Sequence, residues 1–159
     1  MNGINKKISS DAISKLNKEL QKSLNAVDEE IINRLDKSIP LINDIGKHLI
    51  NASGKRLRPL LTLTMAAQLN DFSRNPIILA AAVEFIHTAT LLHDDVVDES
   101  LTRRGKKTAN LLWDNKSSIL VGDFLFSRAF QLMVSTNSLK VLKVLSNTAA
   151  FISESEVLQ

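Results

Sequence analysis

Four carboxylates stand within six residues near the middle of the sequence, in the segment 94–99 (DDVVDE). Asp94 and Asp98 are four residues apart, so they share one face of a helix. Two carboxylates on one face repel each other unless a cation lies between them. Oxygen ligands suit a hard ion such as Mg²⁺, which also binds substrate phosphates. The pattern predicts a Mg²⁺ site at Asp94 and Asp98, with Asp95, about 100° round the helix, in a supporting role.

The alternative interpretation of this segment is a solvated acidic helix end. We favour the metal site because residues 77–92, directly before it, are almost wholly apolar. A buried helix that opens onto a cluster of like charges needs a partner for that cluster.

Two basic segments flank the acidic one, and both could bind an anion. The first, residues 54–59 (GKRLRP), places Lys55 and Arg58 at a predicted helix start, where exposed N–H groups add positive potential. The second, residues 102–107 (TRRGKK), places Arg103 and Arg104 directly after the carboxylates. The first alone is compatible with a solvated basic loop, and the second could simply neutralise the carboxylates. Together with the acidic face they indicate a metal-bound diphosphate whose remaining oxygens the arginines hold.

Further candidates lie on the apolar helix that precedes Asp94. His87 stands two helical turns before Asp94 on the same face. A substrate hydrogen bond and a satisfied core histidine are its two interpretations. His93 lies on a different face, so we expect it to pack or to support its neighbours. Ala89 is one of several small residues that predict either close helix packing or a tunnel for an apolar substrate tail.

The apolar periodicity predicts an all-α chain around these residues. Gly (5) and Pro (3) supply only 8 of 159 residues, or about 5% against roughly 12% on average, which argues against a sandwich or barrel of short strands. No alternating strand pattern is found. The helix predicted over residues 76–97 is apolar on nearly all sides, which is typical of a central buried helix. Helices are expected over residues 11–37, 40–51, 59–70, 76–97, 116–134 and from 138 to the end.

The last predicted helix carries an apolar side but no stop signal. The residues expected on its buried side are Val141, Leu142, Val144, Leu145, Ala149, Ile152 and Val157. No Gly, Pro or basic turn closes this helix before Gln159. This favours a chain cut within a larger fold.

Composition and patterning argue against several classes of protein. The absence of Cys excludes disulfides, thiolate zinc sites and a cysteine nucleophile, and it suits a reducing cytoplasm. A net charge of +3 and an aromatic content of 4% without Tyr argue against nucleic-acid binding. The N-terminus lacks the apolar core of a signal peptide. We expect no transmembrane segment, because the most apolar run, residues 77–92, is shorter than the roughly 20 residues of a span.

Several motifs resemble, in order and spacing, those of the trans-polyprenyl diphosphate synthases. These are residues 54–59 (GKRLRP), 84–105 (EFIHTATLLHDDVVDESLTRRG), 121–130 (VGDFLFSRAF) and 152–159. The resemblance covers about residue 30 to the end and is strongest to the octaprenyl type, which makes the side chain of respiratory quinones. It implies a helical bundle of the isoprenoid synthase type. It also implies a Mg²⁺-dependent condensation of isopentenyl diphosphate with an allylic diphosphate.

The resemblance implies a role for each candidate residue. Asp94, Asp95 and Asp98 match the catalytic first aspartate-rich motif, in which Asp94 and Asp98 hold Mg²⁺. Arg103 matches the arginine on the allylic diphosphate. The residues that match the isopentenyl diphosphate site are Lys55, Arg58, His87 and Arg104. Ala89 matches a position that faces the growing chain, where a small side chain implies a medium or long product.

One part of the family pattern is missing from this sequence. The family has a second aspartate-rich motif on a later helix, whereas this chain has a single Asp-Asp pair, Asp94-Asp95. Residues 1–159 are therefore expected to be the N-terminal part of one synthase domain, inactive alone and homodimeric in its full-length form. The alternatives are a non-catalytic subunit of a heteromeric synthase and, less favoured, an HD-type phosphohydrolase that binds metal at His93-Asp94.

Overall fold

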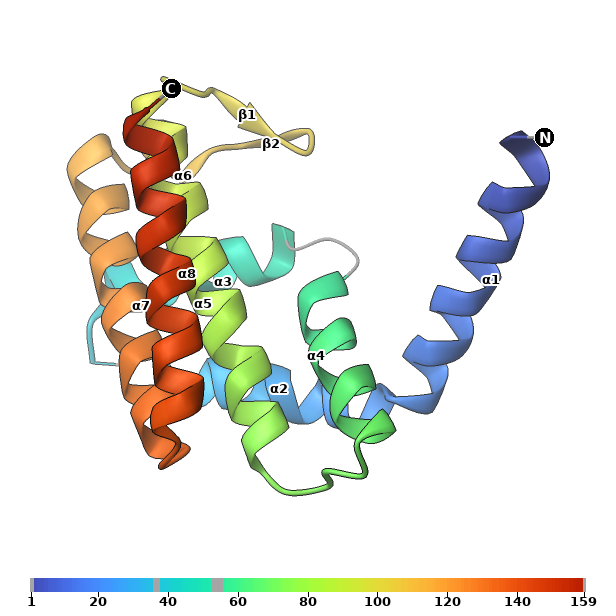
Figure 1. The fold of residues 1–159 in the computed structure, drawn as a ribbon. Coiled ribbons are helices and arrows are strands. Elements are labelled where there is room, and N and C mark those ends of the chain that lie inside the picture. Colours follow the sequence, from blue (N-terminus) through green and yellow to red (C-terminus); the bar gives the residue numbers. More distant parts are fainter. Residues whose placement is uncertain (1, 36–37, 53–55, 159) are drawn as a thin grey trace.

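Helices form most of this structure, a computed structural model that describes residues 2–35, 38–52 and 56–158 (Figure 1). The helices are α1 (Asn2–Glu19), α2 (Gln21–Arg34), α3 (Pro40–Ala52), α4 (Leu57–Gln68), α5 (Asn75–Val97), α6 (Ala109–Leu112), α7 (Asn115–Ser135) and α8 (Leu139–Val157). A short antiparallel hairpin, β1 (Thr102–Arg103) with β2 (Lys106–Lys107), lies between α5 and α6. The prediction of an all-α chain is confirmed.

α5 is the central helix of the molecule. It packs chiefly against α7 and also contacts α2, α4 and α6. Pro76 stands in its first turn, where a missing N–H costs nothing. Ala80, Ala81 and Ala82 are wholly buried, so neighbouring helices approach the backbone of α5 closely. The predicted buried helix is therefore confirmed, and it ends at the acidic segment.

The contact between α5 and α7 depends on a glycine at the level of the carboxylates. A Cβ atom at Gly122 of α7 would collide with the imidazole ring of His93 on α5. The Nε2 atom of His93 lies 3.3 Å from the carbonyl oxygen of Ile119 and 3.5 Å from Oδ1 of Asp123. His93 thus packs against α7, as expected for a residue off the face of Asp94.

Two predicted elements differ from the structure. The helix expected over residues 11–37 is divided at Leu20 (φ −98°, ψ 10°) into α1 and α2. The apolar spacing of Leu16, Leu20 and Leu24 continues across this break, so periodicity alone does not reveal it. The second basic segment, residues 102–107, lies outside every predicted helix and forms the β1–β2 hairpin, whose strands are too short to show alternation.

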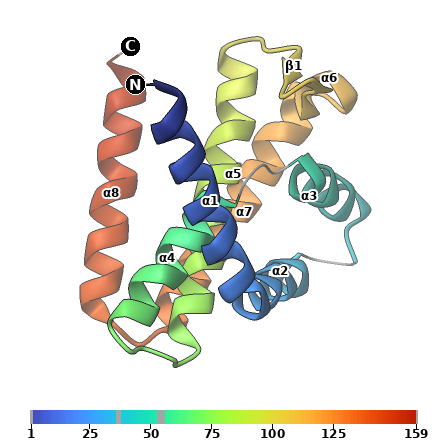
Figure 2. The same ribbon diagram turned by 90° about the vertical axis from the view of Figure 1, so that its right-hand side faces the viewer.

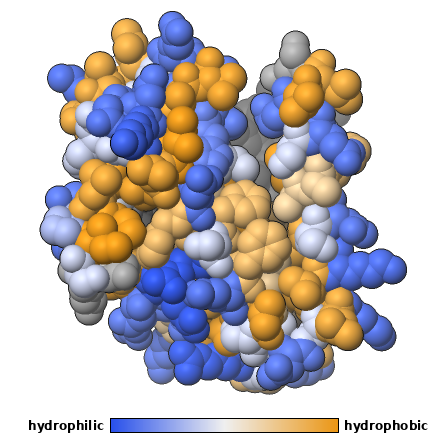
Figure 3. Space-filling view, turned by 90° about the vertical axis from the view of Figure 1, so that its left-hand side faces the viewer, coloured by the Kyte–Doolittle hydropathy of each residue, from blue (hydrophilic) through white to orange (hydrophobic). Residues whose placement is uncertain are grey.

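The structure corrects the prediction that one side of α8 is buried. No residue of α8 is buried, and Val144 and Val157, both expected on its buried side, are 62% and 87% exposed. Leu142 and Leu145 pack against the core, and α7 is the main neighbour of α8 among the described elements. Figure 2 shows α8 at one edge of the molecule, and Figure 3 shows exposed apolar side chains on the adjoining face. An apolar stripe predicts a face to be buried but not whether a neighbour is present to bury it.

Two helices are long and apolar enough to span a membrane by length and composition alone, α5 and α7. Half of the apolar window of α5 and 39% of that of α7 are buried inside the molecule. Core helices pass the same test, so these two helices are weak evidence for a span.

Candidate active site

Asp94 and Asp98 lie one turn apart at the carboxyl end of α5. The N–H of Asp98 donates to the carbonyl oxygen of Asp94 at 2.8 Å, which continues the helical path through this turn. Asp94 is partly buried and Asp98 is exposed. Burial raises the pKa of Asp94, and the charge of Glu156 on α8 raises it further. Negative charge thus gathers at this helix end from two directions.

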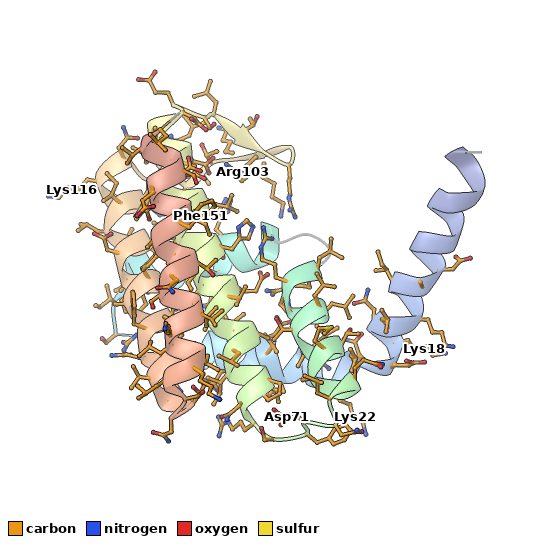
Figure 4. The ribbon with its side chains drawn as sticks, viewed as in Figure 1. Lys18, Lys22, Asp71, Arg103, Lys116 and Phe151 are labelled. Carbon is orange, nitrogen blue, oxygen red and sulfur yellow. The ribbon has the colours of Figure 1, made fainter. Side chains whose placement is uncertain are left out.

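Asp95 does not share the face of Asp94 and Asp98 and instead forms an ion pair with Arg103 of β1. Asp95 is only 3% exposed, and its Oδ1 atom accepts from Nε of Arg103 at 2.9 Å and lies 2.8 Å from Nη2. Figure 4 shows Arg103 toward the same end of the molecule as Phe151 on α8. Asp95 therefore fixes the hairpin beside the carboxylate face, and Nη1 of Arg103 takes part in neither of these two contacts.

Three further hydrogen bonds hold the chain between α5 and α6. Nδ2 of Asn110 donates to the carbonyl oxygens of Asp95 and Ser100, both at 3.2 Å. The hydroxyl of Thr108 donates to the carbonyl oxygen of Ser100 at 2.7 Å. The turn itself has positive φ at Arg104 (52°) and Gly105 (75°), and glycine adopts such angles readily. The sequence does not identify Asn110, because an asparagine in a helix has no motif to mark it.

His87 lies among arginines that come from two separate segments. Burial lowers the pKa of His87 to about 4, and the charges of Arg58, Arg104 and Arg103 lower it in the same direction. The structure thus brings Arg58 of α4 and the hairpin arginines toward one histidine of α5. His87 is neutral at neutral pH, so one ring nitrogen can donate a hydrogen bond and the other can accept one. Lys55, predicted for the same site, lies outside the described residues.

Ala89 lies on α5 between His87 and Asp94. It is fully buried, with 0% of its surface exposed. The structure therefore places it inside the bundle wall, and its predicted role in product length stays a prediction.

The donor set at the end of α5 fits Mg²⁺ better than a tightly ligated transition metal. Among the described residues, no three His, Asp or Glu side chains are grouped closely enough to hold a metal alone. Mg²⁺ is commonly bound through one or two carboxylates and takes its other ligands from water and phosphates. Asp94 and Asp98 supply such a pair. Burial and, after it, nearby carboxylates raise the pKa of Asp94, and a bound cation would offset the repulsion between these carboxylates.

The same geometry does not favour a phosphohydrolase centre at His93-Asp94. Such a centre needs both side chains on one metal, whereas His93 faces the backbone of α7 at Ile119. Glu156 of α8 instead adds charge near Asp94. Nothing in the sequence spacing relates Glu156 to Asp94, so only the fold identifies it.

Known proteins resemble this chain in sequence and in fold. The sequence profile of polyprenyl synthetases matches residues 39–159. Octaprenyl diphosphate synthase of Escherichia coli (strain K12) is 46% identical over 147 residues, which cover 92% of this chain and 46% of that protein. The chain thus spans about half the length of this relative.

Solved structures agree with the sequence match. A decaprenyl diphosphate synthase from Rhodobacter capsulatus superposes with a TM-score of 0.89 at 53% identity, over 92% of this chain and 46% of that one. A polyprenyl synthase from Caulobacter crescentus, complexed with calcium and isoprenyl diphosphate, has a TM-score of 0.88 at 49% identity over 92% and 45%. The chain belongs to the polyprenyl synthetase family.

Proposed function

We propose that this chain is the N-terminal half of a trans-polyprenyl diphosphate synthase. The full enzyme joins isopentenyl diphosphate to an allylic diphosphate and yields a medium or long all-trans polyprenyl diphosphate. The observation that carries the proposal is the convergence at one helix end: the charge of Arg103 acts on both Asp94 and His87, and Arg58 and Arg104 act on His87 as well. The identity to octaprenyl diphosphate synthase supports an octaprenyl-like product for quinone side chains.

In this proposal two cationic groups of residues hold two diphosphates. Arg58, Arg104 and His87, with Lys55, bind isopentenyl diphosphate. Arg103 binds the allylic diphosphate through Nη1 while Asp95 keeps its Nε and Nη2 in place. Fixing both substrates at one helix end turns an encounter of two molecules into a reaction of adjacent groups.

Asp94 and Asp98 would hold Mg²⁺ against the allylic diphosphate. When bound, Mg²⁺ neutralises charge on a departing diphosphate and so favours ionisation of the allylic C–O bond. The double bond of isopentenyl diphosphate then attacks the allylic carbon, and the released diphosphate accepts the proton that is lost. No side chain of this chain needs to act as acid or base, so its charged residues contribute positioning and electrostatic stabilisation.

Three further properties belong to the same proposal. Ala89, a small residue on α5, leaves room for a long product, so Ala89→Phe in the full enzyme shortens it. The exposed apolar side chains of α7, such as Leu120 and Val134, support a homodimer interface in the full-length form. The enzyme is proposed to be cytoplasmic, in keeping with the absence of Cys from residues 1–159. We take α5 and α7 to be core helices rather than transmembrane segments, because both are partly buried inside the molecule.

The exposed apolar face of α8 supports the proposal that this chain is only half of the domain. Leu139, Phe151 and Leu158 are 83%, 70% and 86% exposed, and exposed apolar patches mark interaction surfaces. Covering this face with the second half of the bundle would also supply the second aspartate-rich motif. The same face favours the alternative of a non-catalytic subunit that pairs with a catalytic chain.

A transfer assay with labelled isopentenyl diphosphate, an allylic diphosphate and Mg²⁺ tests the proposal. We expect little product from the chain alone and product formation when the C-terminal half of the Escherichia coli relative is added. Robust turnover by the chain alone would contradict the half-domain assignment. A mixture that forms no product while an intact synthase does would favour the non-catalytic subunit.

A further inference from the structure

Arg56 occupies a backbone conformation that most residues avoid. It directly precedes α4 and has φ 49° and ψ 37°, in the left-handed region that favours glycine. Its side chain is nevertheless largely buried, with 19% of its surface exposed. An arginine in a position suited to glycine needs compensating contacts from its side chain.

The guanidinium of Arg56 joins two other helices. Its Nη2 atom lies 2.7 Å from Oδ1 of Asp28 on α2, and its Nη1 atom lies 3.6 Å from Oε2 of Glu84 on α5. Glu84 is 8% exposed, and burial raises the pKa of its carboxyl group. The positive charge of Arg56 lowers the pKa of Glu84 more than any other nearby cation does, and so opposes the effect of burial.

Glu84 lies one helical turn before His87, close to the cations assigned to isopentenyl diphosphate. The charges of Arg58 and Arg104 act on both Glu84 and His87. An unpaired carboxylate at Glu84 would attract these two arginines and repel a bound diphosphate. The anion site therefore needs a cation devoted to Glu84.

We propose that Arg56 is a positioning residue for the diphosphate site: it neutralises Glu84, ties the start of α4 to α2 and α5, and so leaves Arg58 and Arg104 free for the ligand. This inference rests on the proposed function, because it assumes that Arg58 and Arg104 bind a diphosphate. Arg56 itself faces carboxylates and does not contact the ligand.

Calorimetric titration of the 159-residue chain with inorganic pyrophosphate, in EDTA, tests the inference. Without Mg²⁺ the titration reports the cationic site rather than the carboxylates. We expect Arg56→Gln to weaken binding about tenfold and Arg56→Gln/Glu84→Gln to restore most of it. Arg74→Gln is the matched control, since Arg74 also joins α2 to α5, through an ion pair with Glu30 at 2.8 Å. It should bind as the wild type does.

The results distinguish a failure of the proposed anion site from a failure of the role proposed for Arg56. A wild-type chain that does not bind pyrophosphate would overturn the proposed anion site and this inference with it. A wild-type chain that binds while Arg56→Gln binds equally well, or is not rescued by Glu84→Gln, would overturn the role of Arg56 alone. Glu84→Gln by itself should bind pyrophosphate at least as tightly as the wild type does. This variant tests the inference even if Arg56→Gln fails to fold. Circular dichroism of each variant confirms that it is folded.

Discussion

At the scale of single residues, the burial of His87 makes the stability of the chain depend on pH. Its pKa of about 4 lies below the usual value of 6.5, first because of burial and then because of the arginines around it. Between these two pH values the unfolded chain binds a proton at this histidine and the folded chain does not. The free energy of unfolding therefore rises as pH rises through that window and falls on acidification.

His87→Gln should remove this contribution. We expect the free energy of unfolding of the variant to depend less on pH than that of the wild type between about pH 4 and 6.5. Urea denaturation at several pH values measures the two slopes. Equal slopes would show that His87 titrates normally in the folded chain.

Gly122 makes a second residue-scale prediction. Gly122→Ala places a Cβ atom against the His93 ring, and overpacking of this kind costs about 1–3 kcal/mol. Alanine also favours the helix by about 1 kcal/mol, so the net loss of stability is smaller than the clash alone.

Urea denaturation of the variant measures this net loss. In a His93→Ala background the clash is absent, so the same Gly122→Ala change should stabilise the chain. Destabilisation in both backgrounds would contradict the assigned contact.

At the scale of elements, Asp95 organises the β1–β2 hairpin. Removing one partner of a buried ion pair leaves an uncompensated charge. Arg103 is 37% exposed, so water reduces this cost, and we expect Asp95→Ala to lose about 1–2 kcal/mol. Limited trypsin digestion should then cut faster after Arg103 and Arg104. The control Asp98→Ala lies on an exposed residue and should leave the digestion rate unchanged.

Elements could be predicted where local signals agree with the final contacts. Pro76 and a helix apolar on nearly all sides predict α5, and the structure has it at the centre. The break at Leu20 and the hairpin at Arg103 escaped prediction. The break at Leu20 leaves the apolar period of the sequence unchanged. The hairpin depends on the contact between Arg103 and Asp95, which exists only in the folded chain.

At the scale of the whole molecule, α8 is held on one side only. Phe151 is 70% exposed, whereas Leu145 packs against the core. Phe151→Gln should therefore change the free energy of unfolding by no more than about 0.5 kcal/mol, and Leu145→Gln should cost about 1–3 kcal/mol. Chemical denaturation of both variants compares them. A large cost for Phe151→Gln would show that its ring is buried in the isolated chain.

The candidate site could be predicted in its parts but not in its connections. The four-residue spacing of Asp94 and Asp98 indicates one face, and the structure has them on successive turns. That Arg103 is bound to Asp95, and that Glu156 acts on Asp94, depends on residues brought together only by folding.

Titration of the chain with farnesyl diphosphate, an allylic diphosphate, with and without Mg²⁺, tests the central claim most directly. We predict that Mg²⁺ tightens binding about tenfold or more and that Asp94→Asn removes most of this gain, because the variant loses a metal ligand. Glu99→Gln, on an exposed residue beyond α5, is the matched control and should bind as the wild type does. Binding that is absent, independent of Mg²⁺ or unaffected by Asp94→Asn would contradict the assignment of this helix end as a diphosphate and metal site.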